Sequence, residues 1–191
     1  MSIPGAQSRP KIIGLVDFEN ILFSLPVMHL IHSGGRLPLE NAFEEFTKWL
    51  EEIGEIKSIF VFGSEKSIFS RRINFYKLNW FPILCPKIKR WVPKTGYQFG
   101  LEPEENQEKD TSDAILMRFW SMLNDLSGWD ILCLASGDID FAPLARETLR
   151  RERKIAIAAV GEIPLSRELE ETASLDPKTG KPMVHYFYPT N

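Results

Sequence analysis

Two aspartates one residue apart follow an apolar stretch in the segment "LASGDIDFAPL". Asp138 and Asp140 come directly after the predicted strand 130–136, and Asp17 stands at the end of the predicted strand 11–18. Because the carboxyl ends of parallel strands meet at one edge of a sheet, we expect these carboxylates to lie close together. A buried strand end rarely tolerates an unpaired charge, so Asp17 is the hardest of them to explain by folding alone.

A fourth aspartate reaches the same edge from a helix. The segment 110–126 has the apolar spacing of a helix, and Asp113 lies in its first turn on the stripe that includes Leu116 and Trp120. We therefore expect Asp113 to point inward. A helix that precedes a strand in such a sheet starts at the edge where the other carboxylates are expected.

Gathered carboxylates favour a metal site. Two carboxylates about 4 Å apart repel each other by roughly 4 kcal/mol at an effective dielectric constant of 20. A divalent cation removes this penalty, and Mg²⁺ and Mn²⁺ prefer oxygen ligands of this kind. Such ions activate water and stabilise the charge of a phosphodiester displacement. The pattern predicts a Mg²⁺ or Mn²⁺ site made by Asp17, Asp113, Asp138 and Asp140.

Each aspartate also has a simpler explanation. Asp140 could be the N-cap of a helix that begins at Phe141. Asp138, after a glycine, could be a turn residue. Asp113 could stabilise its own helix through the helix dipole. The expectation of a shared site depends on their common position at one edge.

Neighbouring polar residues are candidates for supporting roles. Asn20 could bind a metal-bound water or a phosphate, or cap the turn after Asp17. Glu19 would point away from Asp17 if the extended backbone continued, which makes it a weaker candidate. The hydroxyl of Ser136 could bind a ligand's water, and Gly137 would permit a close approach of the backbone.

A basic and aromatic concentration between residues 71 and 94 could hold nucleic acid. Cations can follow the phosphates while aromatic faces stack on unpaired bases. The alternative is a solvated helix face with aromatic core residues. Since the segment leaves the third predicted strand, we expect it to border the same edge; its candidate substrate-binding residues are Arg71, Arg72, Lys87, Lys89, Arg90 and Trp91, with Ser136 from the later strand.

The order of elements predicts an α/β fold. Strands that alternate with helices indicate parallel βαβ units, and hence a three-layer α/β/α sandwich with a mainly parallel central sheet. We expect a loose tail over 1–10, the main domain over 11–173, and a C-terminal turn and edge strand over 174–191. The predicted strands are 11–18, 57–63, 81–86, 130–136, 154–161 and 183–188; the predicted helices are 39–54, 65–80, 110–126, 141–152 and 165–173, with a short helical turn in an insert at 24–38 and an exposed loop at 95–109.

Composition limits the class of protein. The chain has 191 residues, of which 43% are hydrophobic, and this suits one compact domain. A net charge of −3 excludes binding of nucleic acid by bulk charge alone, although a local basic groove remains compatible with it. Cys85 and Cys133 lie in apolar runs and do not form a disulfide framework. With no signal sequence or membrane span in view, we expect a cytoplasmic protein.

The three acidic segments, taken in order, resemble the NYN domain, a branch of the PIN-like nuclease superfamily. They are "LVDFENI" (15–21), "KDTSDAIL" (109–116) and "SGDIDFAPL" (136–144), and the similarity extends over about 11–162. This resemblance implies a Mg²⁺- or Mn²⁺-dependent ribonuclease. By position, its acidic site would be Asp17, Asp113, Asp138 and Asp140, with Asn20 beside it.

The sequence departs from the family pattern at three places. Ile139 replaces a small polar residue, Thr111 and Ser112 stand where glycine and valine are usual, and "SRELEETASLDP" lacks an aspartate commonly found near its end. These departures bear on the class of substrate more than on metal binding.

We therefore predict a metal-dependent endoribonuclease whose partner is RNA or single-stranded DNA, with a homodimer left open. One alternative is a non-catalytic nucleic-acid-binding or scaffold module on the same fold. Another is a phosphatase that uses Asp17 as its nucleophile; such enzymes commonly have a second aspartate two residues later, where this chain has Glu19.

Overall fold

The computed structural model of the chain describes residues 8–31, 39–70, 73–90, 107–109, 111–162 and 164–188. Their main feature is a six-stranded parallel sheet with strand order β3-β2-β1-β6-β7-β8. The strands are β1 (Lys11–Asp17), β2 (Glu55–Gly63), β3 (Trp80–Leu84), β6 (Ile131–Ala135), β7 (Lys154–Ala159) and β8 (Val184–Tyr186).

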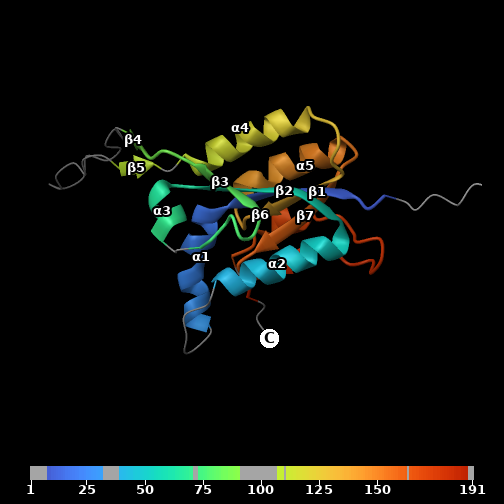
Figure 1. The fold of residues 1–191 in the computed structure, drawn as a ribbon, viewed down its shortest axis with the longest axis horizontal. Helices are drawn as coiled ribbons and strands as arrows, with labels where there is room; N and C mark the ends of the chain where they lie inside the picture. The colour runs from blue at the N-terminus through green and yellow to red at the C-terminus, as the bar shows by residue number, and fades with distance from the viewer. Residues whose placement is uncertain are drawn as a thin grey trace, which may run out of the picture.

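Helices cover both faces of this sheet (Figure 1). One face carries α1 (Phe18–Ile31), α2 (Leu39–Ile53) and α3 (Glu65–Ser70). The other carries α4 (Ser112–Asn124), α5 (Ala142–Arg150), α6 (Arg167–Glu170) and the 3₁₀ turn η1 (Ile139–Phe141). The predicted three-layer α/β/α sandwich with a parallel sheet is confirmed.

Alternation along β1 explains the two cores. Ile12 and Val16 belong to the core beneath α1 and α2, whereas Ile13 and Leu15 belong to the core beneath α4 and α5. Successive side chains of a strand point to opposite faces, so a strand that is buried on both sides must be apolar throughout. Asp17 continues this strand as its last residue and is only 2% exposed.

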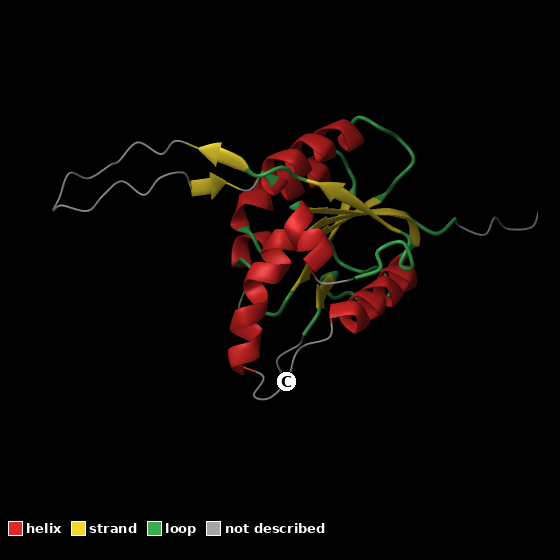
Figure 2. Ribbon diagram, turned by 60° about the vertical axis from the view of Figure 1, so that its left-hand side comes forward, coloured by secondary structure: helices red, strands yellow, loops and turns green. Residues whose placement is uncertain are grey.

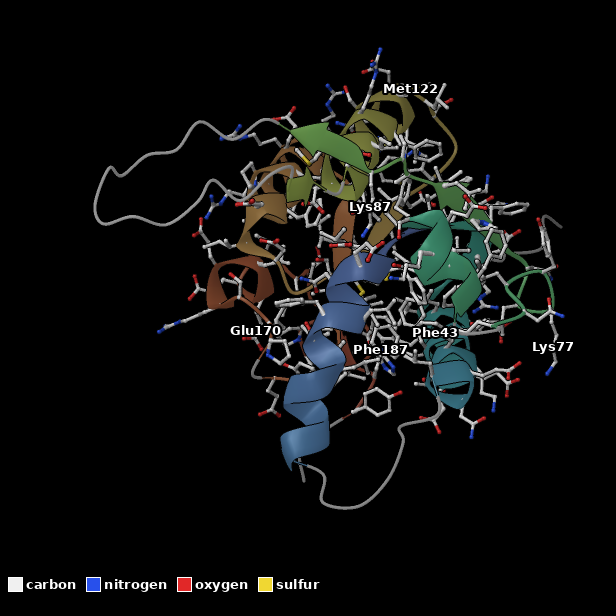
Figure 3. The ribbon with its side chains drawn as sticks, turned by 90° about the vertical axis from the view of Figure 1, so that its left-hand side faces the viewer. Phe43, Lys77, Lys87, Met122, Glu170 and Phe187 are labelled. Carbon is white, nitrogen blue, oxygen red and sulfur yellow. The ribbon has the colours of Figure 1, made fainter. Side chains whose placement is uncertain are left out.

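The α1 and α2 side of the sheet is rich in aromatic residues. Phe43 and Phe46 of α2 are fully buried, as their helical spacing predicts. Phe187, just beyond β8, packs against Phe43 with ring centroids 5.5 Å apart (Figure 3). Burying one such side chain contributes roughly 1.5–3 kcal/mol, so the C-terminal segment is part of the folded core.

Several predicted boundaries were wrong. The first strand ends at Asp17, and α1 starts at Phe18 without a loop, so the predicted insert begins inside a helix; 32–38 lie outside the described residues. Of the predicted helix 65–80, Glu65–Ser70 is helical, 71 and 72 lie outside the described residues, and a turn with Asn79 at a φ of 56° leads into β3.

The predicted loop 95–109 was wrong at its end. Three of its residues form β5 (Gln107–Lys109), which pairs antiparallel with β4 (Ile88–Arg90) beside the main sheet (Figure 2). The hydroxyl of Thr111 donates to the carbonyl of Pro86 at 2.6 Å. This bond ties the start of α4 to the chain that leaves β3.

The order of the strands creates a switch point beside β1. The chain builds outward from β1 to β2 and β3, then crosses to β6 on the other side of β1. The loops after β1 and β6 therefore separate, and open α/β sheets hold their ligands in the crevice that this separation leaves. Asp17 ends one of these strands and Asp138 follows the other.

The structure also bears on the two cysteines and on membrane spans. Cys85 and Cys133 are both buried and free. Among the helices within the described ranges, none combines the length and the apolar character that crossing a membrane requires.

Candidate active site

The carboxylate of Asp17 joins three elements. Its Oδ1 accepts the backbone N–H of Asn20 at 3.2 Å, which makes Asp17 the cap of α1. Its Oδ2 accepts the hydroxyl of Ser136, which follows β6, at 3.0 Å. One carboxylate is thus held at the meeting point of β1, α1 and β6.

The loop after β6 is fixed by its own hydrogen bonds. Ser136, which is fully buried, accepts the N–H of Asp138 at 3.2 Å with the same hydroxyl that donates to Asp17. The N–H of Gly137 donates to Asn20 Oδ1 at 3.0 Å. A Cβ at Gly137 would lie 2.2 Å from the carbonyl oxygen of Pro164, so only glycine fits this close approach.

Asp138 and Asp140 have different positions, although they are only two residues apart. Asp138 is half-buried, and its Oδ1 accepts the N–H of Asp140 at 2.9 Å as the cap of η1. Asp140 is exposed on η1 and does not line the cavity described below. The alternative that Asp140 caps the following helix was wrong: the cap is Asp138, which caps η1, and α5 has no side-chain cap.

Asp113 lies in the first turn of α4, as predicted, but its side chain is exposed. The buried positions of α4 are Ser112, Leu116, Leu123 and Asn124. Leu116 of the predicted stripe is buried, but the prediction that Asp113 points inward was wrong. Ser112, about 100° around the helix from Asp113, is buried in its place. Asp113 faces the open cavity and Ser112 faces inward.

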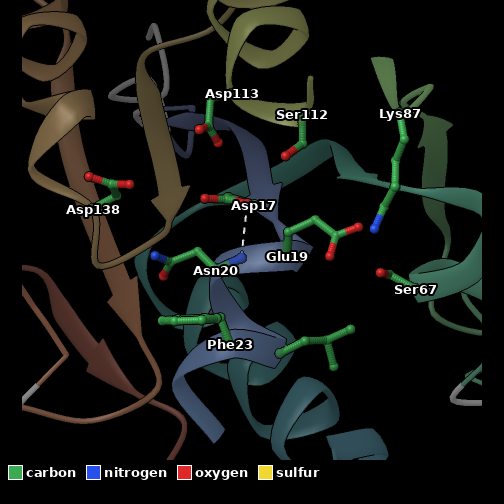
Figure 4. Close-up of a pocket in the computed structure, with 10 residues that line it drawn as sticks. Asp17, Glu19, Asn20, Phe23, Ser67, Lys87, Ser112, Asp113 and Asp138 are labelled. Carbon is green, nitrogen blue, oxygen red and sulfur yellow. Dashed lines mark hydrogen bonds between the residues drawn. The ribbon is translucent and has the colours of Figure 1, made fainter. Parts of the chain in front are cut away.

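These residues surround one open cavity of about 550 Å³ at the switch point. Figure 4 shows the carboxylates of Asp17, Asp113 and Asp138 turned toward a common space. The lining consists of Asp17, Glu19, Asn20, Leu22, Phe23, Ser67, Lys87, Ser112, Asp113 and Asp138.

The surroundings of Asp17 in this cavity disfavour its ionised form. Burial raises the pKa of Asp17 from 3.8 to about 7, and the negative charges of Asp113 and Asp138 act in the same direction. The hydrogen bonds from Asn20 and Ser136 oppose this shift without cancelling it. At neutral pH Asp17 therefore favours a bound proton or a nearby cation.

The donor set suits a hard divalent cation in its chemistry, since it offers carboxylate oxygens that repel one another. In the part of the chain that the structure describes, no three or more His, Cys, Asp or Glu side chains are grouped so that they could enclose an ion. The three aspartates converge on the cavity without closing around a point.

The other half of the cavity contains the positively charged amine of Lys87. Glu19 Oε1 accepts the N–H of Ser64 at 2.8 Å. Burial alone would raise the pKa of Glu19, but hydrogen bonds from Ser67 and Ser64 and the positive charge of Lys87 hold it below its ordinary value. The Lys87 amine lies beside Glu19, across the cavity from Asp138 (Figure 4).

The remaining predicted residues divide into three groups. Asn20 lines the cavity and ties α1 to the loop after β6. Ser136 does not line it, and positions Asp17 instead. Of the basic candidates Lys87 reaches the cavity, whereas the side chains of Lys89 and Arg90, together with Arg71, Arg72 and Trp91, lie outside the described residues.

Five lining residues were not among the predicted site residues: Glu19, Leu22, Phe23, Ser67 and Ser112. The signal for Glu19 and Phe23 was the cap pattern in "DFEN". An aspartate that caps a helix starting at Phe18 brings Glu19, Asn20 and Phe23 to one side of that helix, because positions three and four apart are neighbours.

Comparison with known proteins agrees with this architecture. The family model of the NYN domain matches residues 11–176. A crystal structure of a protein of unknown function from Vibrio parahaemolyticus superposes with a TM-score of 0.63 at 16% identity, over 98% of this chain and 96% of that one. At that identity the likeness concerns the fold alone. No curated protein matches the sequence.

Proposed function

We propose that this chain, which belongs to the NYN domain family, is a Mg²⁺- or Mn²⁺-dependent ribonuclease that hydrolyses phosphodiester bonds in the cavity at the switch point. The family is ribonuclease-like, which supports a hydrolase at the coarse level. The observation that carries the finer proposal is the convergence of Asp17, Asp113 and Asp138, from three separate elements, on one cavity.

Asp17, Asp113 and Asp138 are the proposed ligands. When bound, the ion supplies an activated water at neutral pH and offsets the charge of the phosphate. The elevated pKa of Asp17 supports this assignment, because a carboxylate that is costly to ionise alone gains most from a neighbouring cation. Asp140 is proposed to act only through its backbone N–H, which orients Asp138.

The other residues bind and orient in this proposal. Asn20 uses its Oδ1 for Gly137, so its amide nitrogen is the atom that can donate to a phosphate oxygen. Lys87 supplies a positive charge at the cavity wall for a phosphate that is not cleaved. Ser136 holds the Asp17 carboxylate in one orientation.

The test is cleavage of a fluorescent RNA with Mg²⁺, with Mn²⁺ and in EDTA. We expect cleavage with either ion, none in EDTA, and a loss of about 100-fold or more in Asp113→Asn. Asp125→Asn is the matched control, because Asp125 lies at the other end of α4 and forms a surface ion pair with Arg151.

Two results would oppose the proposal. Equal cleavage by Asp113→Asn and the wild type would indicate a contaminating nuclease. Binding of RNA that EDTA does not change, without cleavage under any divalent ion, would support the non-catalytic module instead.

A further inference from the structure

An aromatic side chain stands exposed at the edge of the candidate active site. Phe23 of α1 is 84% exposed and lines the cavity. By contrast Phe18, five residues earlier on the same helix, is fully buried. A single exposed apolar side chain is common on protein surfaces, so the observation that points to binding is that Phe23 belongs to the lining of the cavity.

The position of Phe23 matters more than its exposure. Phe69 of α3 is also 61% exposed, but it does not line the cavity. Phe23 follows Glu19 by four residues and Asn20 by three, so the three share one side of α1. One helical turn advances about 5.4 Å, so Phe23 lies about one turn along α1 from Asn20. Figure 4 shows Phe23 next to Asn20.

The cavity therefore offers three kinds of contact within a short span. Carboxylates lie at its centre, an amine lies on one wall at Lys87, and an aromatic face lies along α1 at Phe23. A phosphate bridged to the carboxylates by a cation, with its base laid on the ring, would use all three. Every nucleobase has a flat face that stacks on an aromatic ring.

We propose that Phe23 is a stacking platform for an unpaired base next to the scissile phosphate. This inference rests on the proposed function and adds a substrate-binding residue to it. In a duplex the faces of each base are covered by its neighbours, so a base must leave the stack to reach Phe23. Duplex RNA should be a poor substrate.

Charge favours a nucleobase over a peptide as the occupant. Three aspartates and Glu19 line the cavity against one lysine, and this balance repels an acidic peptide. A basic peptide would compete with the cation that the carboxylates hold. A neutral, flat base beside a cation-bridged phosphate meets neither objection.

The first experiment measures stacking without cleavage. Single-stranded RNA carrying 2-aminopurine is titrated with protein in Ca²⁺, and quenching of its fluorescence reports stacking of that base. We expect the wild type, Phe23→Tyr and the control Phe69→Ala to quench it, and Phe23→Ala and Phe23→Leu not to. Phe23→Leu keeps an apolar side chain, so quenching retained there would overturn the proposal in favour of a non-aromatic contact, such as one with a second copy of the chain.

The second experiment is a double-mutant cycle that combines Phe23→Ala in the protein with the loss of one base in the RNA. The abasic nucleotide is placed at each position of the RNA in turn, and kcat/KM is measured with Mg²⁺. Each change alone should lower kcat/KM by about 5- to 150-fold at one position, and both together should lower it little further. Independent losses would overturn the proposal. A wild type that quenches 2-aminopurine but cleaves nothing would refute the proposed function and leave the stacking platform supported.

Discussion

The hydroxyl of Ser136 donates to Asp17 Oδ2 at 3.0 Å and accepts the N–H of Asp138 at 3.2 Å. One buried side chain thus joins the two central strands of the sheet at their carboxyl ends. It also fixes the relative position of two carboxylates that are more than a hundred residues apart in the sequence. The geometry of the acidic cavity depends on this bond.

Removing that hydroxyl should affect both stability and activity. In Ser136→Ala, Asp17 Oδ2 loses its donor and the N–H of Asp138 loses its acceptor. We expect a loss of about 1–3 kcal/mol in the free energy of unfolding, measured with urea. We expect RNA cleavage to fall by about 10- to 100-fold, as for residues that orient metal ligands.

The control is Ser127→Ala, at an exposed position between α4 and β6. It should change neither quantity. If Ser136→Ala and Ser127→Ala behaved alike, the bond to Asp17 would have no positioning role.

The metal-free protein should lose stability as the pH rises. The pKa of Asp17 is about 7 in the folded state because of burial, against 3.8 when it is unperturbed. Between these values the folded state holds a proton that the unfolded state has released. Stability from this proton is full below pH 3.8 and is lost as the pH rises through 7, by about 4 kcal/mol in total.

This loss can be isolated with Asp17→Asn in EDTA. The free energy of unfolding of the wild type, relative to the variant, should fall between pH 4 and pH 7 and then level off. Added Mg²⁺ or Mn²⁺ at pH 8 should stabilise the wild type and not the variant. A difference between the two proteins that stays constant with pH would contradict a raised pKa of the buried Asp17 carboxylate.

Asp138 and Asp140 should differ sharply when each is replaced by alanine. Asp138→Ala removes a carboxylate from the cavity and should abolish cleavage. Asp140→Ala keeps the backbone N–H that binds Asp138, so its activity should stay within about twofold of the wild type. Rates with RNA and Mn²⁺ measure both. If Asp140→Ala were inactive, Asp140 would have to be counted as a metal ligand.

Acid should lower the stability of the protein through His185, which does not line the acidic cavity. Burial lowers the pKa of His185 from 6.5 to about 4, and its ring stacks on Trp49 with centroids 5.1 Å apart. The stability that comes from keeping the ring neutral is present above pH 6.5 and is lost as the pH falls through 4. The loss should be about 2–3 kcal/mol.

His185→Phe keeps a ring against Trp49 and removes a buried Nε2 that has no hydrogen-bond partner among the described residues. Between pH 6.5 and pH 4 its unfolding free energy should fall less than that of the wild type. RNA cleavage at neutral pH should be equal in the two proteins. An equal loss of stability on acidification would show that His185 titrates normally.

The sequence by itself determined the sheet and the elements of the site. Apolar runs of strand length, alternating with helices, are local patterns, and a parallel sheet follows from them because βαβ units close in one way. Since strand ends are local features too, the sequence alone assigns Asp17 and Asp138 to one edge of the sheet. That edge is the one where the cavity lies.

The tertiary structure alone decided which side chains enter the cavity. Asp113 and Ser112 differ by one residue, and the packing of α4 against the sheet selected which of them is buried. The bond from Asn20 to Asp17 started α1 at Phe18, which brought Glu19 and Phe23 to the cavity. Apolar spacing indicates the buried face of a helix, but it does not decide which of two adjacent polar residues at the helix start turns inward. Contacts between distant segments decide it, and sequence periodicity does not contain them.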